Sequence, residues 1–387
     1  MSTTGRRVLI VAGEASGDQH AARLVEQVRQ HAPDITFSGI AGPAMRALGV
    51  EPLYPAERLS IVGLWEAVRH LRALLAIIAD LRERMRREPP ALLILVDLPE
   101  FNLRLAREAK RLGVPVLYYI SPQIWAWRQG RVKKIAQRVD HMAVIFPFEV
   151  DFYRRAGVPV TFVGHPLLEE PIPHPAREAW CAQHGLEPPR PLVALLPGSR
   201  ESEIERLLPA MLEAARRLRE RLPAVQFVLP RAATLPEAAI RERVAEAGVE
   251  VTVTAGESRQ AMAVADAVLV ASGTATLEVA LAGTPMVIVY RVAPLTAWLM
   301  RRLLKIEHVG LCNIVAGTRV VPELLQEEAT PDRMAAELAR YLEEPDHART
   351  TRARLGEVAA RLGQRETGDD IASLVLRMLN SPGAQRT

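Results

Sequence analysis

Two short segments in the second half of the chain have the composition of a phosphate-binding site. The first, Ser272-Gly273-Thr274, follows the apolar run Ala267–Val270 and precedes residues of helical pattern. A helix N-terminus presents free backbone N–H groups and the positive end of the helix dipole, which both suit a phosphate. Glu278 lies about one helical turn further on, where its carboxylate can accept hydrogen bonds from ribose hydroxyls. An ordinary capped βα turn has a similar composition, so this segment alone decides little.

The second segment, Pro197-Gly198-Ser199-Arg200, follows the apolar run Leu192–Leu196. Its glycine lets the backbone approach an anion closely, and its arginine can neutralise one. In open α/β sheets, ligands bind beyond the carboxyl ends of the strands, where both segments fall. The pair therefore predicts a diphosphate site. Its expected residues are Gly198, Ser199, Arg200, Ser272, Gly273 and Thr274.

Carboxylates gather at the equivalent positions in the first half of the chain. Glu14, Ser16 and Asp18 lie in the turn after the apolar run Arg7–Ala12. The glycines of this turn do not have the G-x-G-x-x-G spacing of a dinucleotide site, which argues against an NAD-dependent dehydrogenase. Glu14 and Asp18 are candidate catalytic groups, although Ser16 and Asp18 also suit a helix start.

Asp97 directly follows the buried run Ala91–Val96. A carboxylate in such a place is costly unless it is paired or functional. Apolar neighbours would raise its pKa toward that of a useful general base, so Asp97 is the preferred catalytic residue. The alternative is a structural loop anchor, and Glu14, Asp18 and Glu100 remain further candidates for the base.

Two tryptophans and an arginine follow another predicted strand, in Ser121-Pro122-Gln123-Ile124-Trp125-Ala126-Trp127-Arg128. Trp125, Trp127 and Arg128 together offer a flat apolar wall beside a cation, which suits a sugar or an acyl group. The alternative is a packed aromatic anchor. Residues 61–87 have apolar side chains at helical spacing, flanked by arginines, and predict an amphipathic helix. Such a helix either packs into the core or lies on an anionic bilayer.

These segments require strands and helices in alternation, which predicts α/β domains with doubly wound parallel sheets. The proline-rich residues 169–175 interrupt the alternation. We therefore expect Rossmann-like domains at 1–168 and 177–345. The helices at 346–380 are expected to pack back on the first domain or on a partner chain, which would make a homodimer.

Composition excludes several classes of protein. The 387 residues include only two cysteines, so a disulfide framework or a structural zinc site is not expected. No signal-peptide pattern is present, and no apolar run is long enough to cross a bilayer. The net charge of +4 is spread along the chain with few aromatic residues nearby, which argues against nucleic acid. A cytoplasmic protein is expected.

Five motifs in order resemble the lipid-A-disaccharide synthase family over residues 7–375. They are Gly13-Glu14-x-Ser16-Gly17-Asp18, Ser121-Pro122-x-x-Trp125-Ala126-Trp127-Arg128, Val163-Gly164-His165-Pro166, Leu196-Pro197-Gly198-Ser199-Arg200 and Ala271-Ser272-Gly273-Thr274-Ala275-Thr276-Leu277-Glu278. The resemblance implies a GT-B fold, in which two Rossmann-like domains face each other across a cleft. The implied reaction transfers 2,3-diacylglucosamine from its UDP derivative to the 6-hydroxyl of 2,3-diacylglucosamine 1-phosphate. It inverts the anomeric carbon and needs no metal or other cofactor.

The resemblance also implies roles for single residues. Asp97 would be the general base, Glu278 would hold the ribose, and Asn313 would lie near the uracil or the sugar. Residues 61–87 would contact the inner face of the inner membrane. Two departures from the family pattern, Glu100 and Cys312, weaken Glu100 as a catalytic candidate and leave the aim of Asn313 open.

The alternatives belong to other functional classes. A UDP-N-acetylglucosamine 2-epimerase or a glycosyltransferase with a water-soluble acceptor would use the same nucleotide site. A non-catalytic protein that binds a nucleotide sugar or a membrane surface would turn nothing over.

Overall fold

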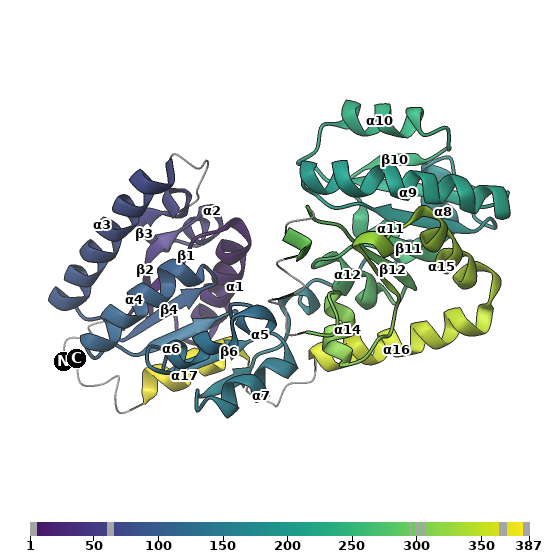
Figure 1. Ribbon diagram of the computed structural model, residues 1–387. Helices are drawn as coiled ribbons and strands as arrows, with labels where there is room; N and C mark the ends of the chain where they lie inside the picture. Colours follow the sequence, from purple (N-terminus) through teal and green to yellow (C-terminus); the bar gives the residue numbers. More distant parts are fainter. Residues whose placement is uncertain are drawn as a thin grey trace. The chain divides into compact units, whose positions relative to one another are not determined.

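The computed structural model describes residues 6–59, 66–293, 296–298, 302, 306–363 and 370–381, with the side chains of 66–71 left out. The chain divides into two compact units (Figure 1). Unit 1 comprises Met1–Pro166 and Gln364–Thr387, and unit 2 comprises Leu167–Gly363.

Unit 1 is built on a parallel sheet of seven strands in the order β3-β2-β1-β4-β5-β6-β7. The strands are β1 (Arg7–Ala12), β2 (Thr36–Ala41), β3 (Glu51–Pro55), β4 (Leu92–Val96), β5 (Val116–Tyr119), β6 (His141–Val144) and β7 (Val160–Phe162). Strands β1 and β4 are almost wholly buried, as the continuous apolar runs predict for strands covered on both faces. The order reverses between β1 and β4, which is the point where open α/β sheets bind ligands.

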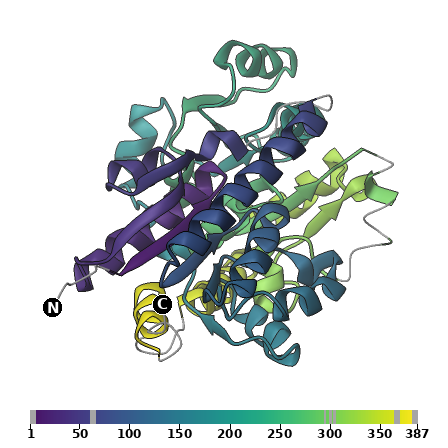
Figure 2. The same ribbon diagram turned by 90° about the vertical axis from the view of Figure 1, so that its left-hand side faces the viewer.

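The helices of unit 1 cover both faces of this sheet. They are α1 (Ala15–His31), α2 (Pro43–Ala47), α3 (Glu66–Arg87), α4 (Pro99–Arg111), α5 (Ile124–Trp127), α6 (Val132–Ala136), α7 (Pro147–Arg155) and α17 (Ile371–Asn380). Helices α3 and α4 share one core with the sheet, and α3, in dark blue, lies over the purple strands in Figure 2. Helix α17 packs on α1. No helix in the described part of the chain is long and apolar enough to cross a membrane.

Unit 2 repeats the plan with six parallel strands in the order β10-β9-β8-β11-β12-β13. The strands are β8 (Leu192–Leu196), β9 (Gln226–Arg231), β10 (Thr252–Ala255), β11 (Ala267–Ala271), β12 (Met286–Tyr290) and β13 (Glu323–Leu325). The helices are α8 (Arg177–Gln183), α9 (Glu201–Arg221), α10 (Glu237–Glu246), α11 (Ser258–Val264), α12 (Ala275–Ala282), α14 (Leu311–Ala316), α15 (Pro331–Glu343) and α16 (Pro345–Gly363). Its order reverses between β8 and β11.

The α/β class and the parallel sheets are as predicted, but some elements differ. Strands β3 and β13 are short edge strands whose residues form no long apolar run. An edge strand such as β3 also tolerates its two prolines. The helices of residues 346–380 were expected to pack together on the first domain or on a partner chain, but they pack on different units. Helix α16 packs on α12, α14 and α15 of unit 2, while α17 packs on α1 of unit 1.

Candidate functional site

One cavity of about 560 Å³ in unit 2 brings together most of the residues predicted to bind a nucleotide. It lies at the carboxyl ends of β8 and β11, the two strands between which the strand order reverses. We call this reversal the switch point of the sheet. The predicted residues that line it are Gly198, Ser199, Arg200, Ser272, Gly273, Thr274 and Glu278. Segments more than seventy positions apart in the sequence therefore meet in one hollow.

The loop after β8 depends on a glycine. Gly198 has φ +113°, a value that L side chains rarely adopt. A Cβ atom at this position would also lie 2.2 Å from Oε2 of Glu203. The tight turn between β8 and α9 therefore requires glycine for both conformation and space.

Glu203, which the sequence analysis did not single out, occupies this loop. Its Oε2 accepts hydrogen bonds from the backbone N–H groups of Ser199 and Arg200, at 2.9 and 3.2 Å. The guanidinium of Arg200 is 81% exposed and lies 3.5 Å from Oε1 of the same carboxylate. The loop thus already holds one anionic group. A glutamate three residues into the helix is the signal that could have revealed this capping arrangement.

The turn after β11 leaves its donors available. Ser272 donates through Oγ to the carbonyl oxygen of Val309 at 3.3 Å. Gly273 and Thr274 are exposed, and their backbone N–H groups have no hydrogen-bond acceptor in the described part of the chain. Helix α12 begins at the next residue, so its positive end faces the same cavity.

Glu278 is held by an arginine that the sequence analysis missed. Nε of Arg259, on α11, lies 3.5 Å from Oε1 of Glu278. Arg259 also donates to the carbonyl oxygen of Glu170 at 2.7 Å. Burial raises the pKa of Glu278, and the charge of Arg259 partly offsets that rise. No spacing in the sequence links these residues, which only the packing of α11 against α12 brings together.

Asn313, which the resemblance would place near the uracil or the sugar, is not among the residues that line this cavity. The side chain is fully buried, and its Nδ2 donates to the carbonyl oxygen of Val321 and to Oε1 of Glu323, at 2.9 and 2.8 Å. Its Oδ1 accepts from the backbone N–H groups of Val320 and Val321. Both donors and both lone pairs are therefore used within the protein. The contacts are those of a residue that holds the chain before β13.

In unit 1, Asp97 lies at the switch point in a strained conformation. Asp97 and Leu98 have φ of 51° and 44°, in the left-handed region that non-glycine residues avoid. The carbonyl oxygen of Asp97 accepts hydrogen bonds from Nδ2 of Asn102, at 2.7 Å, and from the hydroxyl of Tyr118. These bonds hold the main chain in place, as strained residues at functional sites require. The first turn of α4 then begins at Pro99.

The carboxyl group of Asp97 has a raised pKa. Burial is the main cause, and the negative charge of Glu14 adds to it, while the backbone N–H of Leu98 acts in the opposite direction. Glu14 is exposed at the start of α1, in the turn after β1. Two of the predicted carboxylates thus interact across the switch point between β1 and β4.

Asp18, the third predicted catalytic carboxylate, has a different setting. It is 3% exposed, and its oxygens accept from the backbone N–H groups of Gly42, Ala44 and Met45, at 2.9, 2.8 and 3.3 Å. These donors are the free groups at the start of α2. Asp18 therefore ties α1 to α2 rather than facing a substrate. Ser16 is exposed in the first turn of α1 and does not cap that helix.

The two tryptophans of the second motif have opposite environments. Trp125 is buried, and its Nε1 donates to Oε1 of Glu149 at 3.0 Å. These contacts fit the alternative interpretation, in which this tryptophan is a packed aromatic anchor. Burial raises the pKa of Glu149 to about 7. Trp127 is 41% exposed, with the guanidinium of Arg128 at 4.0 Å from its ring centre. Only Trp127 and Arg128 present the wall and cation that the sequence suggested.

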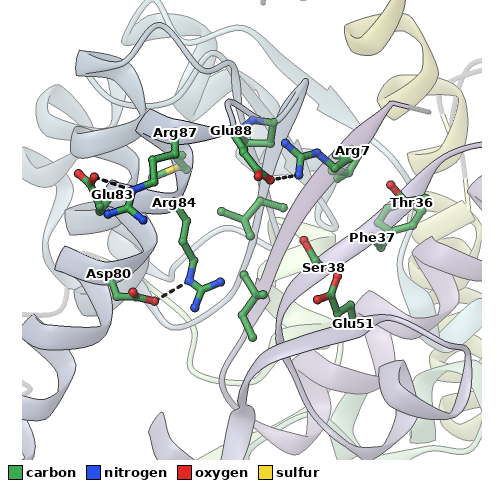
Figure 3. Close-up of a pocket in the computed structure, with 15 residues that line it drawn as sticks. Arg7, Thr36, Phe37, Ser38, Glu51, Asp80, Glu83, Arg84, Arg87 and Glu88 are labelled. Carbon is green, nitrogen blue, oxygen red and sulfur yellow. Dashed lines mark hydrogen bonds and ion pairs between the residues drawn. The ribbon is translucent and has the colours of Figure 1, made fainter. Parts of the chain in front are cut away.

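A further cavity of unit 1, of about 390 Å³, lies between α3 and the first residues of β1, β2 and β3 (Figure 3). Its three arginines are each paired with a carboxylate of the lining, Arg7 with Glu88, Arg84 with Asp80 and Arg87 with Glu83. It lies at the amino ends of the strands, whereas the switch point of unit 1 lies at their carboxyl ends. This cavity is therefore not the candidate site.

The described part of the chain is similar in fold to several solved structures. A putative UDP-N-acetylglucosamine 2-epimerase from Listeria monocytogenes matches with a TM-score of 0.63 and 11% identity, over 97% of this chain and 95% of that one. The glycotransferase of kitacinnamycin matches with a TM-score of 0.60 and 15% identity, over 97% and 99%. At such identities the likeness shows the fold alone, which is GT-B.

Sequence comparison is more specific. The model of the lipid-A-disaccharide synthetase family matches residues 8–373. The lipid-A-disaccharide synthase of Geobacter metallireducens is 51% identical over 374 residues, 97% of this chain and 97% of that protein. That of Nitrosococcus oceani is 47% identical over 386 residues and the full length of both. The chain belongs to the lipid-A-disaccharide synthase family of glycosyltransferases.

Proposed function

We propose that this protein transfers 2,3-diacylglucosamine from UDP-2,3-diacylglucosamine to the 6-hydroxyl of 2,3-diacylglucosamine 1-phosphate. The products are UDP and a β-1′,6-linked disaccharide 1-phosphate. The observation that carries the proposal is the cavity of unit 2, which gathers seven of the residues predicted to bind the nucleotide around one hollow at a switch point. Membership of the family supports the choice of substrates.

Unit 2 would bind the nucleotide. The free N–H groups of Gly273 and Thr274 and the positive end of α12 suit a diphosphate, and the exposed guanidinium of Arg200 lies beside them. Glu203 would release the Ser199 and Arg200 N–H groups or sit next to the phosphates. Glu278, held by Arg259, suits the ribose hydroxyls.

Unit 1 would supply the base. Its raised pKa makes the Asp97 carboxylate a stronger base than an ordinary aspartate. In the proposed step it takes the proton of the acceptor 6-hydroxyl, whose oxygen attacks the anomeric carbon opposite UDP. The bond between the acceptor oxygen and the anomeric carbon forms as the bond between the anomeric carbon and the diphosphate oxygen breaks. UDP leaves with the electron pair, and its charge is stabilised by Arg200 and by α12.

We also propose peripheral contact with the cytoplasmic face of the inner membrane, through α3. Leu75 is 46% exposed there, with arginines on the same helix. The predicted apolar residues Leu64 and Trp65 lie outside the described residues, as do the side chains of Val68 and Leu71. The homodimer expected from the terminal helices remains a prediction for analytical ultracentrifugation.

The test is UDP release from UDP-2,3-diacylglucosamine by the purified protein, with and without the acceptor in mixed micelles. The proposal expects release only with acceptor, and a disaccharide 1-phosphate in the mass spectrum. Conversion of UDP-N-acetylglucosamine without any acceptor would instead indicate an epimerase. Binding of UDP without turnover of either substrate would contradict an enzymatic role.

A further inference from the structure

A third cavity, of about 540 Å³, lies in unit 1 between α3, α4 and α6 and has an unusual charge. Six cationic side chains line it, against two carboxylates. The cations are Arg82, Arg104, Arg107, Arg131, Lys134 and Arg138. We call this cavity the cationic groove. Its formal excess of four positive charges contrasts with the paired charges of the cavity in Figure 3.

The two carboxylates of the groove are shared among several arginines. Oxygens of Glu108 lie 3.9 Å from Arg82, 3.3 Å from Arg107 and 3.1 Å from Arg111. Glu100 is likewise shared between Arg131 and Arg128, which lies outside the groove lining. Pairing within the protein therefore does not neutralise the groove.

The excess of positive charge is evident at three of the groove cations. Arg104 and Lys134 are exposed, and they make no hydrogen bond or ion pair with any part of the chain that the structure describes. The pKa of Arg138 is lowered, mainly by burial and also by the charge of Arg107. Crowded like charges repel, so a bound anion would stabilise this arrangement. Arginines and lysines are the usual partners of a phosphate.

The groove also has an apolar part and a defined position. Leu75, Ile78 and Leu103 line it, and Leu75 is 46% exposed. Its lining includes Pro99 and Glu100, in the first turn of α4 directly after Asp97. With consecutive Cα atoms about 3.8 Å apart, the Cα atoms of Asp97 and Glu100 are at most about 11 Å apart. One end of the groove therefore lies close to the proposed base.

We propose that the cationic groove binds the phosphate of the acylated acceptor, with acyl chain along its apolar part, while Asp97 faces the acceptor hydroxyl. The inference rests on the proposed function and adds the part of unit 1 that selects a phosphorylated acceptor. Free phosphate lacks the apolar portion that the groove would cover. A general anionic lipid lacks the sugar hydroxyl that must reach Asp97.

The first test is the double variant Arg104→Ala/Lys134→Ala, assayed in micelles of a non-ionic detergent. We expect the KM for 2,3-diacylglucosamine 1-phosphate to rise about tenfold, equivalent to about 1.4 kcal/mol. The kcat and the KM for the UDP donor should stay within about twofold, because both side chains are exposed and unpaired. The control is Lys133→Ala/Arg155→Ala, which removes two exposed cations outside the groove. An unchanged acceptor KM would overturn the proposal.

The second test uses 2,3-diacylglucosamine without its phosphate. The KM of wild type for this acceptor should be raised by about the same factor as the KM of the double variant for the phosphorylated acceptor. The double variant should show no further rise of its KM when the phosphate is absent. Equal losses by the variant on both acceptors would contradict a contact to the phosphate. An effect of the variant that appears only when phosphatidylglycerol is added to the micelles would assign the groove to the bilayer surface instead.

Calorimetric titration of the protein with acceptor micelles separates this inference from the proposed function. Groove-dependent binding in a protein without transferase turnover would leave the groove proposal standing and remove the reaction. Normal turnover with unchanged acceptor binding in the variant would leave the proposed reaction standing and remove the groove proposal.

Discussion

The two units share one architecture but place opposite chemistry at their switch points. In unit 1 the turns after β1 and β4 carry Glu14 and Asp97, and the pKa of Asp97 is raised mainly by burial and further by the charge of Glu14. In unit 2 the turns after β8 and β11 carry a glycine loop with Arg200 and a helix start with free N–H groups. One switch point suits removal of a proton, and the other suits an anion. Parallel sheets thus determine where ligands bind, and the residues after each strand determine which ligands.

The largest effect expected from this comparison concerns Asp97. Asp97→Asn keeps the shape of the side chain and removes the base, so kcat should fall by about 10²–10⁴-fold. Steady-state kinetics with both lipid substrates measures it. UDP binding in unit 2 should be unchanged, which serves as the internal control. A variant with near-normal kcat would assign Asp97 to loop anchoring.

Asp18 provides the contrast within unit 1, because it holds backbone N–H groups instead of facing a substrate. Asp18→Asn should lower the free energy of unfolding by about 2–3 kcal/mol, since three hydrogen bonds to a buried charged acceptor are weakened. Urea unfolding measures the change. The kcat of the folded variant should stay within about threefold of wild type. A large loss of kcat at unchanged stability would return Asp18 to the catalytic group.

Arg200 tests the other switch point. Arg200→Ala should weaken UDP binding by about 10- to 50-fold through loss of a charge-assisted contact to the diphosphate. Its side chain is 81% exposed, so the fold should not change. Calorimetry with UDP measures the affinity. Arg206→Ala, an exposed arginine of the same helix outside the cavity, is the matched control. Equal losses in the two variants would place the diphosphate elsewhere.

The smallest expected effect is a shift in pH dependence. Glu14→Gln removes a negative charge beside Asp97, so the pKa of Asp97 should fall toward its ordinary value. A base must be ionised to act, so the acid limb of the profile of kcat/KM against pH should move to lower pH. A limb that stays in place would show that burial alone sets this pKa. A limb that moves to higher pH would contradict the predicted sign.

The two segments predicted to bind a nucleotide meet in one cavity, and the sequence could indicate this because their signals are local. An apolar strand, a glycine and a helix start lie within a few residues, and the sheet geometry then brings two such turns together. It preferred Asp97 as the base but kept Asp18 as a catalytic candidate, since both aspartates follow predicted strands of the same sheet. The distinction is which groups surround each carboxyl: the N–H groups of α2 for Asp18, apolar burial and Glu14 for Asp97. The sequence could not reveal the contacts of Asn313 for the same reason, as its four hydrogen-bond partners come from the residues around β13.

The amino-acid sequence was enough to predict the class of fold, the strands that form the two sheet centres, and the turns proposed to carry chemistry. These depend on apolar runs and turn residues, which act over short distances along the chain. The three-dimensional packing was needed to show that the backbone of Asp97 is strained and that Asp18 anchors α2. It was also needed to show that Arg259 holds Glu278, and that six cations around α3, α4 and α6 line one groove. Burial, pKa and charge excess depend on neighbours in space, and those neighbours come from distant parts of the chain.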